Sequence, residues 1–487
     1  MSKSITELQP QNVWQHFYQF TQIPRPSKKE EKAVQFVEQF GKKLGLETIK
    51  DKVGNVLIRK PATKGMEKKK GVILQAHLDM VPQKNTDKEH DFEKDPIEAI
   101  VDGEWVRANK TTLGADNGIG AACILSVLES RSLAHGPVEA LFTIDEETGM
   151  TGAFALQSGL LKGDILINTD SEDEGELYVG CAGGVDANIR FRYKSVKPGN
   201  KYIPYKINVK GLKGGHSGLD INLERANSNL LLIRIIWRAT FKFKTCLSAL
   251  NGGDLRNAIP REASAVILVP VENEPAFMDF FNGHVSVLKS EFRTVEPEMN
   301  ITLEKTEMPG TVIDEDTQNK LISAIYTCPN GVIRMSSDME GLVETSTNLA
   351  IVKTLKDEIN IACLLRSSVD SAKEDLASRI KALFGMAGAD VSFSGSYPGW
   401  KPNPDSVILS VMKEVYHNKF GRIPKVTAIH AGLECGIIGG IYPNLDMISF
   451  GPTIRSPHSP DERVKIETVK KIWEFLVETL KNIPEKS

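Results

Sequence analysis

Acidic and histidine side chains follow several apolar, strand-like runs of this sequence. In VILQAHLDM the apolar run that begins at Val72 ends with His77 and Asp79, which the alternation of a strand places on one face. A buried polar group without a partner costs about 2–7 kcal/mol, so these side chains need something to satisfy them. Comparable positions occur in LFTIDEETGM (Asp145, Glu146 and Glu147), ILINTDSE (Asp170) and GPTIRSPHSPDE (His458), and TLGADNG places Asp116 at the entrance of a helix.

Imidazole and carboxylate groups gathered at one place suit a divalent transition metal. Ligands of open α/β sheets bind beyond the carboxyl ends of the strands, so we expect these residues to meet at one edge of a sheet. Several carboxylates without a cation would repel and raise one another's pKa. Two cations would convert that repulsion into binding, and one aspartate can bridge ions about 3.5 Å apart. A single acid is more often a helix cap and a single histidine more often structural, but the whole set favours a metal site.

The elements that must position these residues alternate between strand and helix patterns over the first 185 residues. SKKEEKAVQFVEQFGKKLG predicts a helix that starts with a capping box of Ser27 and Glu30 and stops at Gly45. GIGAACILSVLES predicts a second helix. This alternation favours a mostly parallel sheet covered on both faces. Strands are expected at 55–60, 72–80, 138–144 and 164–168.

The pattern changes over residues 186–395, where we expect an inserted α+β domain. A strand–helix–strand order occurs twice there, which suggests two similar halves. From residue 396 the α/β pattern returns, so residues 1–185 and 396–487 are predicted to form one discontinuous domain. The inserted domain is expected to have strands at 206–210, 263–270 and 359–365 and helices at 222–240, 274–292 and 371–384.

Composition excludes some classes of function. The 487 residues include 60 basic and 63 acidic side chains, a net charge of −3 that gives no support for binding nucleic acid or an anionic membrane. The six cysteines are scattered without a CxxC pair, as in reduced cytoplasmic proteins. The start, MSKSITELQPQNVW, lacks the apolar core of a signal peptide, and no apolar run is long enough for a membrane span. We therefore expect a cytoplasmic protein, and we interpret SEDEGE (171–176) as a solvated charge cluster.

Two other enzyme classes fit poorly. A dinucleotide fold would use GxGxxG, but GADNGIGAAC has Cys123 at the third glycine position and would set Asp116 against a pyrophosphate. A serine hydrolase would use GxSxG, but GHSGL has Leu219 where the last glycine belongs.

Segments along essentially the whole chain resemble one family. They are similar to the di-zinc exopeptidases of the aminoacylase and carnosinase type, and most of all to their bacterial branch of aminoacyl-histidine dipeptidases (Xaa-His dipeptidases, peptidase D). The resemblance implies a catalytic α/β domain with a mostly parallel sheet, interrupted by an α+β lid domain. No expected metal or catalytic position departs from the pattern. The segments are NVLIRKPAT, LQAHLDMVPQKN, TTLGADNGIG, ILINTDSE, GLKGGHSG, RNAIPRE and IHAGLECG.

By this resemblance the cofactor is a pair of divalent metal ions, Zn²⁺ or alternatively Co²⁺ or Mn²⁺. His77 and Asp170 would hold one ion, and Glu147 and His458 the other. Asp116 would bridge them, with a cis peptide bond following it.

The resemblance also implies the catalytic roles. Glu146 would be the general base, and Asp79 would fix the orientation of His77. His216, in GGHSG, would donate a hydrogen bond to the oxyanion, often across a homodimer formed through the lid domain. Arg366 is a candidate for binding the substrate carboxylate, or else forms a structural ion pair. Further substrate-binding candidates are Asn257 and Gly432, while His430 and Glu434 either line the pocket or hold their loop.

The implied activity is hydrolysis of unblocked dipeptides, preferentially Xaa-His including β-alanyl-histidine. The same chemistry on other substrates is left open: a broader dipeptidase, a tripeptidase or a deacylase of N-acyl amino acids. A relative that binds peptides without cleaving them would be expected to have lost Glu146 or a ligand, and none is missing.

Overall fold

The computed structural model describes residues 4–486, and the chain forms two compact units. Unit 1 extends to Gly180 and resumes over Pro402–Ala428 and from Leu433 onward. Unit 2 consists of Cys181–Lys401 together with the short segment Ile429–Gly432. Within the described residues, no helix has the length and apolar character needed to cross a membrane.

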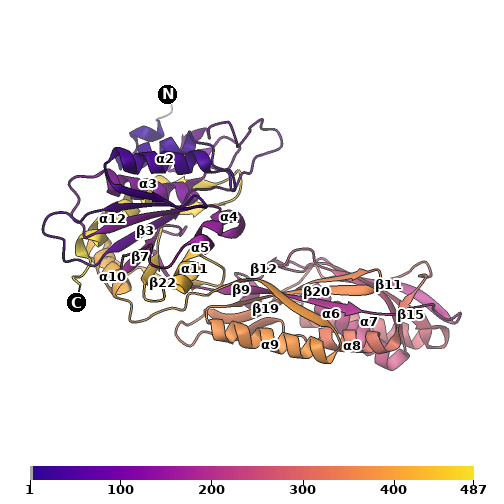
Figure 1. Ribbon diagram of the computed structural model, residues 1–487. Helices are drawn as coiled ribbons and strands as arrows, with labels where there is room; N and C mark the ends of the chain where they lie inside the picture. The colour runs from indigo at the N-terminus through magenta and orange to yellow at the C-terminus, as the bar shows by residue number, and fades with distance from the viewer. Residues whose placement is uncertain (1–3, 487) are drawn as a thin grey trace. The chain divides into compact units, whose positions relative to one another are not determined.

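Unit 1 is built on an eight-stranded mixed sheet (Figure 1). The four strands at its centre are parallel to one another, and the strand on each side of these four runs antiparallel to its central neighbour. The central strands are almost wholly buried, as expected where helices cover both faces. The predicted α/β class is confirmed. In spatial order the strands are β1 (Glu47–Lys50), β2 (Val56–Lys60), β6 (Val138–Thr143), β3 (Val72–His77), β7 (Ile165–Asn168), β23 (Asp446–Ser449), β8 (Glu176–Cys181) and β22 (Lys425–Ile429).

Helices lie on both faces of this sheet (Figure 1). Helix α3 (Ala115–Glu129) is apolar all round because it packs between α1 (Gln11–Thr21) and β3. Helix α2 (Glu31–Lys43) lies on the same side as α3. Three further helices of unit 1 are α10 (Val407–Phe420), α11 (Glu434–Ile441) and α12 (Ile466–Asn482), and α12 packs against α10.

The predicted capping box at the start of α2 is wrong. The N-cap of α2 is Glu30, and it makes no side-chain capping bond. The Ser27 hydroxyl instead donates to Asp79, 2.8 Å away. The Ser27 hydroxyl group therefore satisfies a buried carboxylate from a distant segment instead of capping the helix.

A second, four-stranded sheet holds a hairpin that matters for the site. Its order is β24 (Ile454–Arg455), β25 (Arg463–Lys465), β5 (Trp105–Ala108) and β4 (Ala99–Asp102). The loop joining β24 and β25 contains His458, whose φ of +58° is in the left-handed region. The hairpin therefore presents this histidine from a tight turn rather than from a strand.

Unit 2 contains two halves of the same topology in one nine-stranded sheet. Each half follows the order strand–helix–strand–strand–helix–strand, with the strands arranged 4-1-3-2 as in the split βαβ fold. The repeat expected from the sequence is therefore present. The first half is β11 (Tyr202–Lys210), α6 (Ser228–Phe243), β13 (Cys246–Gly252), β15 (Ala263–Pro270), α7 (Glu274–Glu291) and β16 (Asn300–Lys305); the second is β9 (Gly183–Arg192), α8 (Glu315–Thr327), β19 (Val343–Leu355), β20 (Glu358–Ser367), α9 (Asp370–Met386) and β21 (Asp390–Tyr397).

The first half is inserted between β9 and α8 of the second, and β13 pairs with β19 to join them. The helices line one face of the joint sheet, over a continuous apolar core (Figure 1). Helix α6 begins six residues later than predicted, because the Asn227 side chain accepts hydrogen bonds from the N–H groups of Asn229 and Leu230 and caps the helix there.

Candidate active site and metal centre

The predicted metal ligands converge at the carboxyl ends of the parallel strands in unit 1. His77 is the last residue of β3, and Asp170 follows β7 by two residues. Glu147 lies in the short helix α4 (Glu146–Gly149) directly after β6. Asp116 stands at the start of α3, and His458 arrives from the β24–β25 loop.

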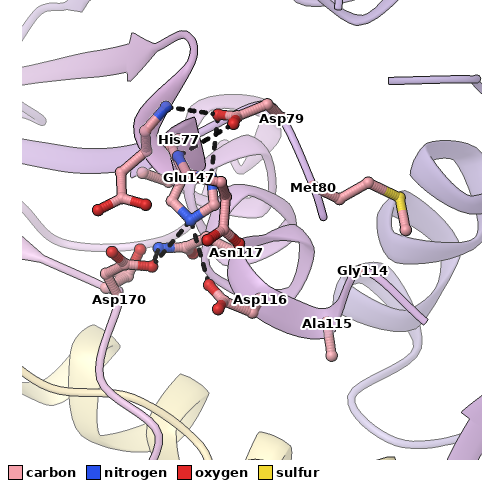
Figure 2. Close-up of polar contacts among 12 residues, drawn as sticks. His77, Asp79, Met80, Gly114, Ala115, Asp116, Asn117, Glu147 and Asp170 are labelled. Atoms are coloured by element: carbon pink, nitrogen blue, oxygen red, sulfur yellow. Dashed lines mark hydrogen bonds and ion pairs between the residues drawn. The ribbon is translucent and has the colours of Figure 1, made fainter. Parts of the chain in front are cut away.

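Asp116 lies between the two histidines. Its Oδ1 is 3.1 Å from His77 Nε2, and its Oδ2 is 3.2 Å from His458 Nε2. Each histidine has a second carboxylate beside it: Asp170 Oδ1 is 3.2 Å from His77 Nε2, and Glu147 Oε2 is 3.0 Å from His458 Nε2. Figure 2 shows the His77 ring between Asp79 on one side and Asp116 and Asp170 on the other. The arrangement is two histidine–carboxylate pairs that share one aspartate.

These residues fit a pair of divalent ions. Oxygen and imidazole donors of one group lie within 4.8 Å of one another, close enough to share an ion. Glu147 Oε1 is buried without a hydrogen-bond partner in the described structure, as expected of an atom that coordinates a metal ion. The candidate groups are His77, Asp116 and Asp170; Asp116, Glu147 and His458; and, overlapping both, His77, Glu146 and Glu147.

In the metal-free protein, the crowded carboxylates raise the pKa values of the neighbouring histidines, and burial raises the pKa of Asp170. Hydrogen bonds to Asp116 and Glu147 raise the pKa of His458 to about 11. Burial raises the pKa of Asp170 to about 7, which the nearby Asp116 charge supports and His77 opposes. Burial lowers the pKa of His77, but Asp170, Asp116 and Asp79 outweigh it and raise the pKa overall. The site therefore takes up protons where a cation would otherwise neutralise the carboxylates.

Asp79 is placed to orient His77. Its Oδ1 is 3.3 Å from His77 Nδ1, an ion-pair distance at which the angle of a hydrogen bond is not met. The backbone N–H groups of Glu146 and Glu147 donate to Asp79 over 3.0 and 3.2 Å, and Ser27 is its third donor. Burial raises the pKa of Asp79, but the nearby His77 ring and these donors hold it at about 2. An ionised Asp79 thus faces the ring edge opposite the two ligand carboxylates.

The segment after Asp116 has the expected backbone. The Asp116–Asn117 peptide bond is cis, as the family resemblance implied. Asn117 Nδ2 donates to Asp170 Oδ1 (Figure 2), so the residue after the shared aspartate holds a carboxylate of the neighbouring pair.

Glu146 is half-buried beside the two pairs. Burial raises its pKa well above the ordinary value, and the carboxylates of Asp170, Glu147 and Glu434 add to the rise while His77 opposes it. A carboxylate with a raised pKa can both accept and return a proton near neutral pH. The adjacent Asp145 accepts hydrogen bonds from Thr148 and Thr151 instead, so it holds the loop.

The sequence left open whether Glu434 lines the pocket or holds its loop, and it gave no role to two other residues around the site, Arg25 and Glu462. Glu434 accepts from Gln75 Nε2 at 2.6 Å and Thr143 Oγ1 at 2.7 Å, so it holds its loop against β3 and β6. Arg25 and Glu462 are buried behind Asp116; only Glu462 had a signal, as the last residue of PHSPDE. The interpretation of SEDEGE as a solvated cluster is wrong for Glu174, whose side chain is 7% exposed and paired with Tyr416 and Arg422.

The predicted oxyanion donor lies in unit 2. His216 Nδ1 accepts hydrogen bonds from the backbone N–H groups of Gly218 and Leu219, at 3.2 and 3.1 Å. Because Nδ1 is an acceptor, the proton of the neutral ring is on Nε2, which can donate. Burial and the nearby Arg366 charge lower the pKa of His216 and keep the ring neutral.

Arg366 is buried in unit 2 and carries no ion pair within residues 4–486. Its Nε donates to Ser217 Oγ at 3.4 Å and its Nη1 to Tyr397 Oη at 3.2 Å. The structural ion pair considered as its alternative is therefore not found. Burial and Arg366 lower the pKa of His430 to about 3, and His430 contacts Ser346 Oγ at 2.7 Å.

The remaining substrate-binding candidates also belong to unit 2. Asn257 is exposed, and its carbonyl accepts from Ser217 N at 2.8 Å, beside His216. Gly432 is half-buried and ends the short segment Ile429–Gly432. The site residues predicted from sequence thus form two groups, one in each unit.

Known proteins are similar to this chain over its full length. It is 45% identical over 484 residues to the cytosol non-specific dipeptidase of Escherichia coli strain K12, covering 99% of both chains. It superposes on the crystal structure of aminoacylhistidine dipeptidase from Vibrio alginolyticus with a TM-score of 0.95 and 47% identity, covering 100% of this chain and 99% of that one. Aminopeptidase PepT of Bacillus cereus shares the fold alone, at 17% identity and a TM-score of 0.57 over 98% of this chain and 99% of that one. Residues 73–482 match the model of peptidase family M20/M25/M40, and the chain belongs to this family.

Proposed function

We propose that this protein is a metallo-dipeptidase that hydrolyses unblocked dipeptides. The observation that carries the proposal is the position of Asp116, with one carboxylate oxygen beside each of two histidines. The names of the two relatives that match over the full chain, both dipeptidases, support it.

The proposed ligands are His77 and Asp170 for one ion and Glu147 and His458 for the other, with Asp116 shared. The donor set suits Zn²⁺, with Co²⁺ and Mn²⁺ as alternatives. When bound, such ions acidify water and polarise a carbonyl group.

The chain's own residues supply the proton transfers. Glu146 takes a proton from the attacking water and returns it to the leaving amine, a role that its raised pKa supports. Asp79 keeps His77 in a single orientation through its three fixed donors.

Unit 2 supplies substrate recognition in this proposal. His216 Nε2 donates to the oxyanion, and Arg366 pairs with the carboxylate at the substrate's C-terminus. Asn257 and Gly432 complete the substrate contacts. The described hydrogen bonds of the buried Arg366 guanidinium go only to the hydroxyl groups of Ser217 and Tyr397. These neutral groups leave its positive charge uncompensated, which supports a role in binding a carboxylate.

The proposed preference is for Xaa-His dipeptides, including β-alanyl-histidine. The relatives' names differ in breadth, since one is a non-specific dipeptidase and the other is an aminoacylhistidine dipeptidase. A broader dipeptidase is therefore the second candidate.

The test combines metal content with hydrolysis of β-alanyl-histidine, a panel of unrelated dipeptides, a tripeptide and an N-acyl amino acid, before and after chelation. Two bound metals and chelator-sensitive cleavage that favours histidine-ending dipeptides are expected. Two metals with equal cleavage of all dipeptides would support the broader activity. Absence of both metal and hydrolysis would overturn the proposal.

The proposal includes a cytoplasmic location and a homodimer formed through unit 2, which would act as a lid. The name of the Escherichia coli relative supports the location. Small-angle scattering with and without a dipeptide-like inhibitor tests the homodimer and the lid movement. A monomer whose scattering does not change would contradict both.

A further inference from the structure

Two buried side chains of opposite charge contact the segments that carry the proposed ligands without being ligands themselves. Arg25 and Glu462 are each 2% exposed. Arg25 lies in the segment before α2, and Glu462 follows His458 by four residues in the β24–β25 loop. Both contact the turn Leu113–Asp116, which leads into α3.

Glu462 binds four successive backbone N–H groups of this turn. Its Oε2 accepts from Leu113 N at 2.7 Å and Gly114 N at 3.0 Å. Its Oε1 accepts from Ala115 N at 2.7 Å and Asp116 N at 3.3 Å. Consecutive N–H groups that point inward form a concavity for an anion, and the φ of +70° at Gly114 produces it here. Helix α3 has no side-chain cap of its own, so Glu462 fixes the start of the helix from a distant segment.

Arg25 holds the other side of the same turn. Its Nη2 donates to the Gly114 carbonyl at 2.5 Å, and its Nη1 donates to the carbonyls of Leu78 and Asp79, both at 2.9 Å. A Cβ atom at position 114 would lie 2.6 Å from Nη2, so the contact requires glycine. No ion pair joins Arg25 to a carboxylate in the part of the chain that the structure describes; its bonds are to backbone carbonyls.

The Gly114 N–H therefore donates to Glu462, and the Gly114 carbonyl accepts from Arg25. Through this one residue, the end of β3, the Asp116 turn and the His458 loop are linked. Figure 2 shows Gly114 and Ala115 on the approach to Asp116. These three segments carry the shared aspartate and both histidines.

We propose that Arg25 and Glu462 are positioning residues that hold Asp116 between His77 and His458 and so set the separation of the two metal positions. The inference rests on the proposed two-metal function. This positioning role differs from a general role in stability, because the turn that Arg25 and Glu462 hold carries Asp116, which belongs to the proposed ligands of both metal ions.

Two conservative variants separate geometry from charge. In Glu462→Gln, the amide nitrogen replaces a carboxylate oxygen and faces two N–H donors, so half of the contacts are lost. In Arg25→Lys the charge stays, but an ammonium group lacks the planar fork that reaches carbonyls in two segments. Glu139→Gln is the matched control. Glu139 is a buried carboxylate that accepts from Lys162 N and Gly163 N at 2.7 and 2.8 Å, at the opposite end of the sheet.

The experiment titrates the full-length, metal-free protein with Co²⁺, measuring affinity by competition with a chelator and the magnetic coupling of the ions by electron paramagnetic resonance. We expect two coupled ions in the natural protein and in Glu139→Gln. In Glu462→Gln and Arg25→Lys we expect affinity to fall about 10- to 100-fold and the coupling to be lost.

Circular dichroism establishes that each variant is folded, and if Arg25→Lys does not fold, Glu462→Gln decides alone. Variants that lose thermal stability but keep two coupled ions at the natural affinity would overturn the inference. If Arg25→Lys alone keeps them, the role of Arg25 is overturned. If the natural protein itself does not bind two ions, the proposed function fails instead.

Discussion

Ser27 Oγ donates a 2.8 Å hydrogen bond to Asp79 Oδ2, so a residue outside the sheet holds the carboxylate that faces His77. We expect Ser27→Ala to lower the free energy of unfolding by about 1.5–3 kcal/mol, the usual loss for a hydrogen bond to a charged group. Urea denaturation measures it. Ser378→Ala, on the exposed face of α9, is the control, and an equal effect in both variants would contradict a special role for Ser27.

Glu146→Gln should separate chemistry from metal binding. The amide cannot accept the proton of water, so turnover should fall about 10²- to 10⁴-fold. Metal content, measured by mass spectrometry of the digested protein, should stay at the natural value, whereas Glu147→Gln should lose metal. Full activity in Glu146→Gln would show that another group is the base.

His458→Ala should reduce the bound metal from two ions to one. His77, Asp116 and Asp170 remain to hold the other ion. His16→Ala is the control, because His16 is also a histidine paired with a carboxylate in unit 1, 3.0 Å from Glu129. Two ions in His458→Ala, or loss of metal in His16→Ala, would contradict the proposed ligand set.

The metal-free protein should become less stable as pH rises from 6.5 to 11. Hydrogen bonds to Asp116 and Glu147 raise the pKa of His458 to about 11. A group whose pKa is raised by folding contributes stability that is complete below its unfolded pKa, about 6.5, and lost as pH rises through the folded value. Burial raises the pKa of Asp170 to about 7, which acts in the same direction over a lower range.

Thermal unfolding of chelator-treated protein at pH 6.5 and 9.5 measures this loss, and His458→Ala should reduce it. Metal affinity should rise over the same interval, because a metal must displace the histidine proton. A metal-free protein that is more stable at pH 9.5 would mean that His458 is not protonated between these carboxylates.

Arg366→Gln should affect only substrates with a free carboxylate. Loss of a charged hydrogen bond, about 1.5–3 kcal/mol, corresponds to a fall in kcat/KM of about 10- to 150-fold for a dipeptide. The corresponding dipeptide amide should be cleaved at nearly the same rate by both proteins. Arg256→Gln, which removes a half-buried arginine 3.5 Å from Asp186, is the control. Equal losses on both substrates would show that Arg366 is structural.

The clustered strand-end residues were predictable because their signal is local. His77 ends an apolar run and Asp170 follows one, and sheet geometry gathers such ends at one edge. The sequence pattern also revealed the strand–helix–strand repeat of unit 2, although not that one half lies inside the other.

The supporting residues could not be predicted because their partners are remote. Glu462 contacts backbone groups 346–349 positions away, and Arg25 contacts carbonyls 53–89 positions away. Backbone donors and acceptors have no side-chain identity, so nothing in the sequence marks them. Ser27 was misassigned for the same reason. The local pattern predicted a helix cap, but the Ser27 hydroxyl group donates to the carboxylate of Asp79, 52 positions away.

The placement of unit 2 within the chain sets the order in which the proposed site is completed. All of unit 2 lies between Asp170 and His458 in sequence. A chain growing from its N-terminus therefore presents His77, Asp116 and Asp170 long before His458 is made. A premature stop anywhere in unit 2 leaves a product that lacks His458 and so has only one of the two histidine–carboxylate pairs. The second proposed metal position is complete only after His458 has been made.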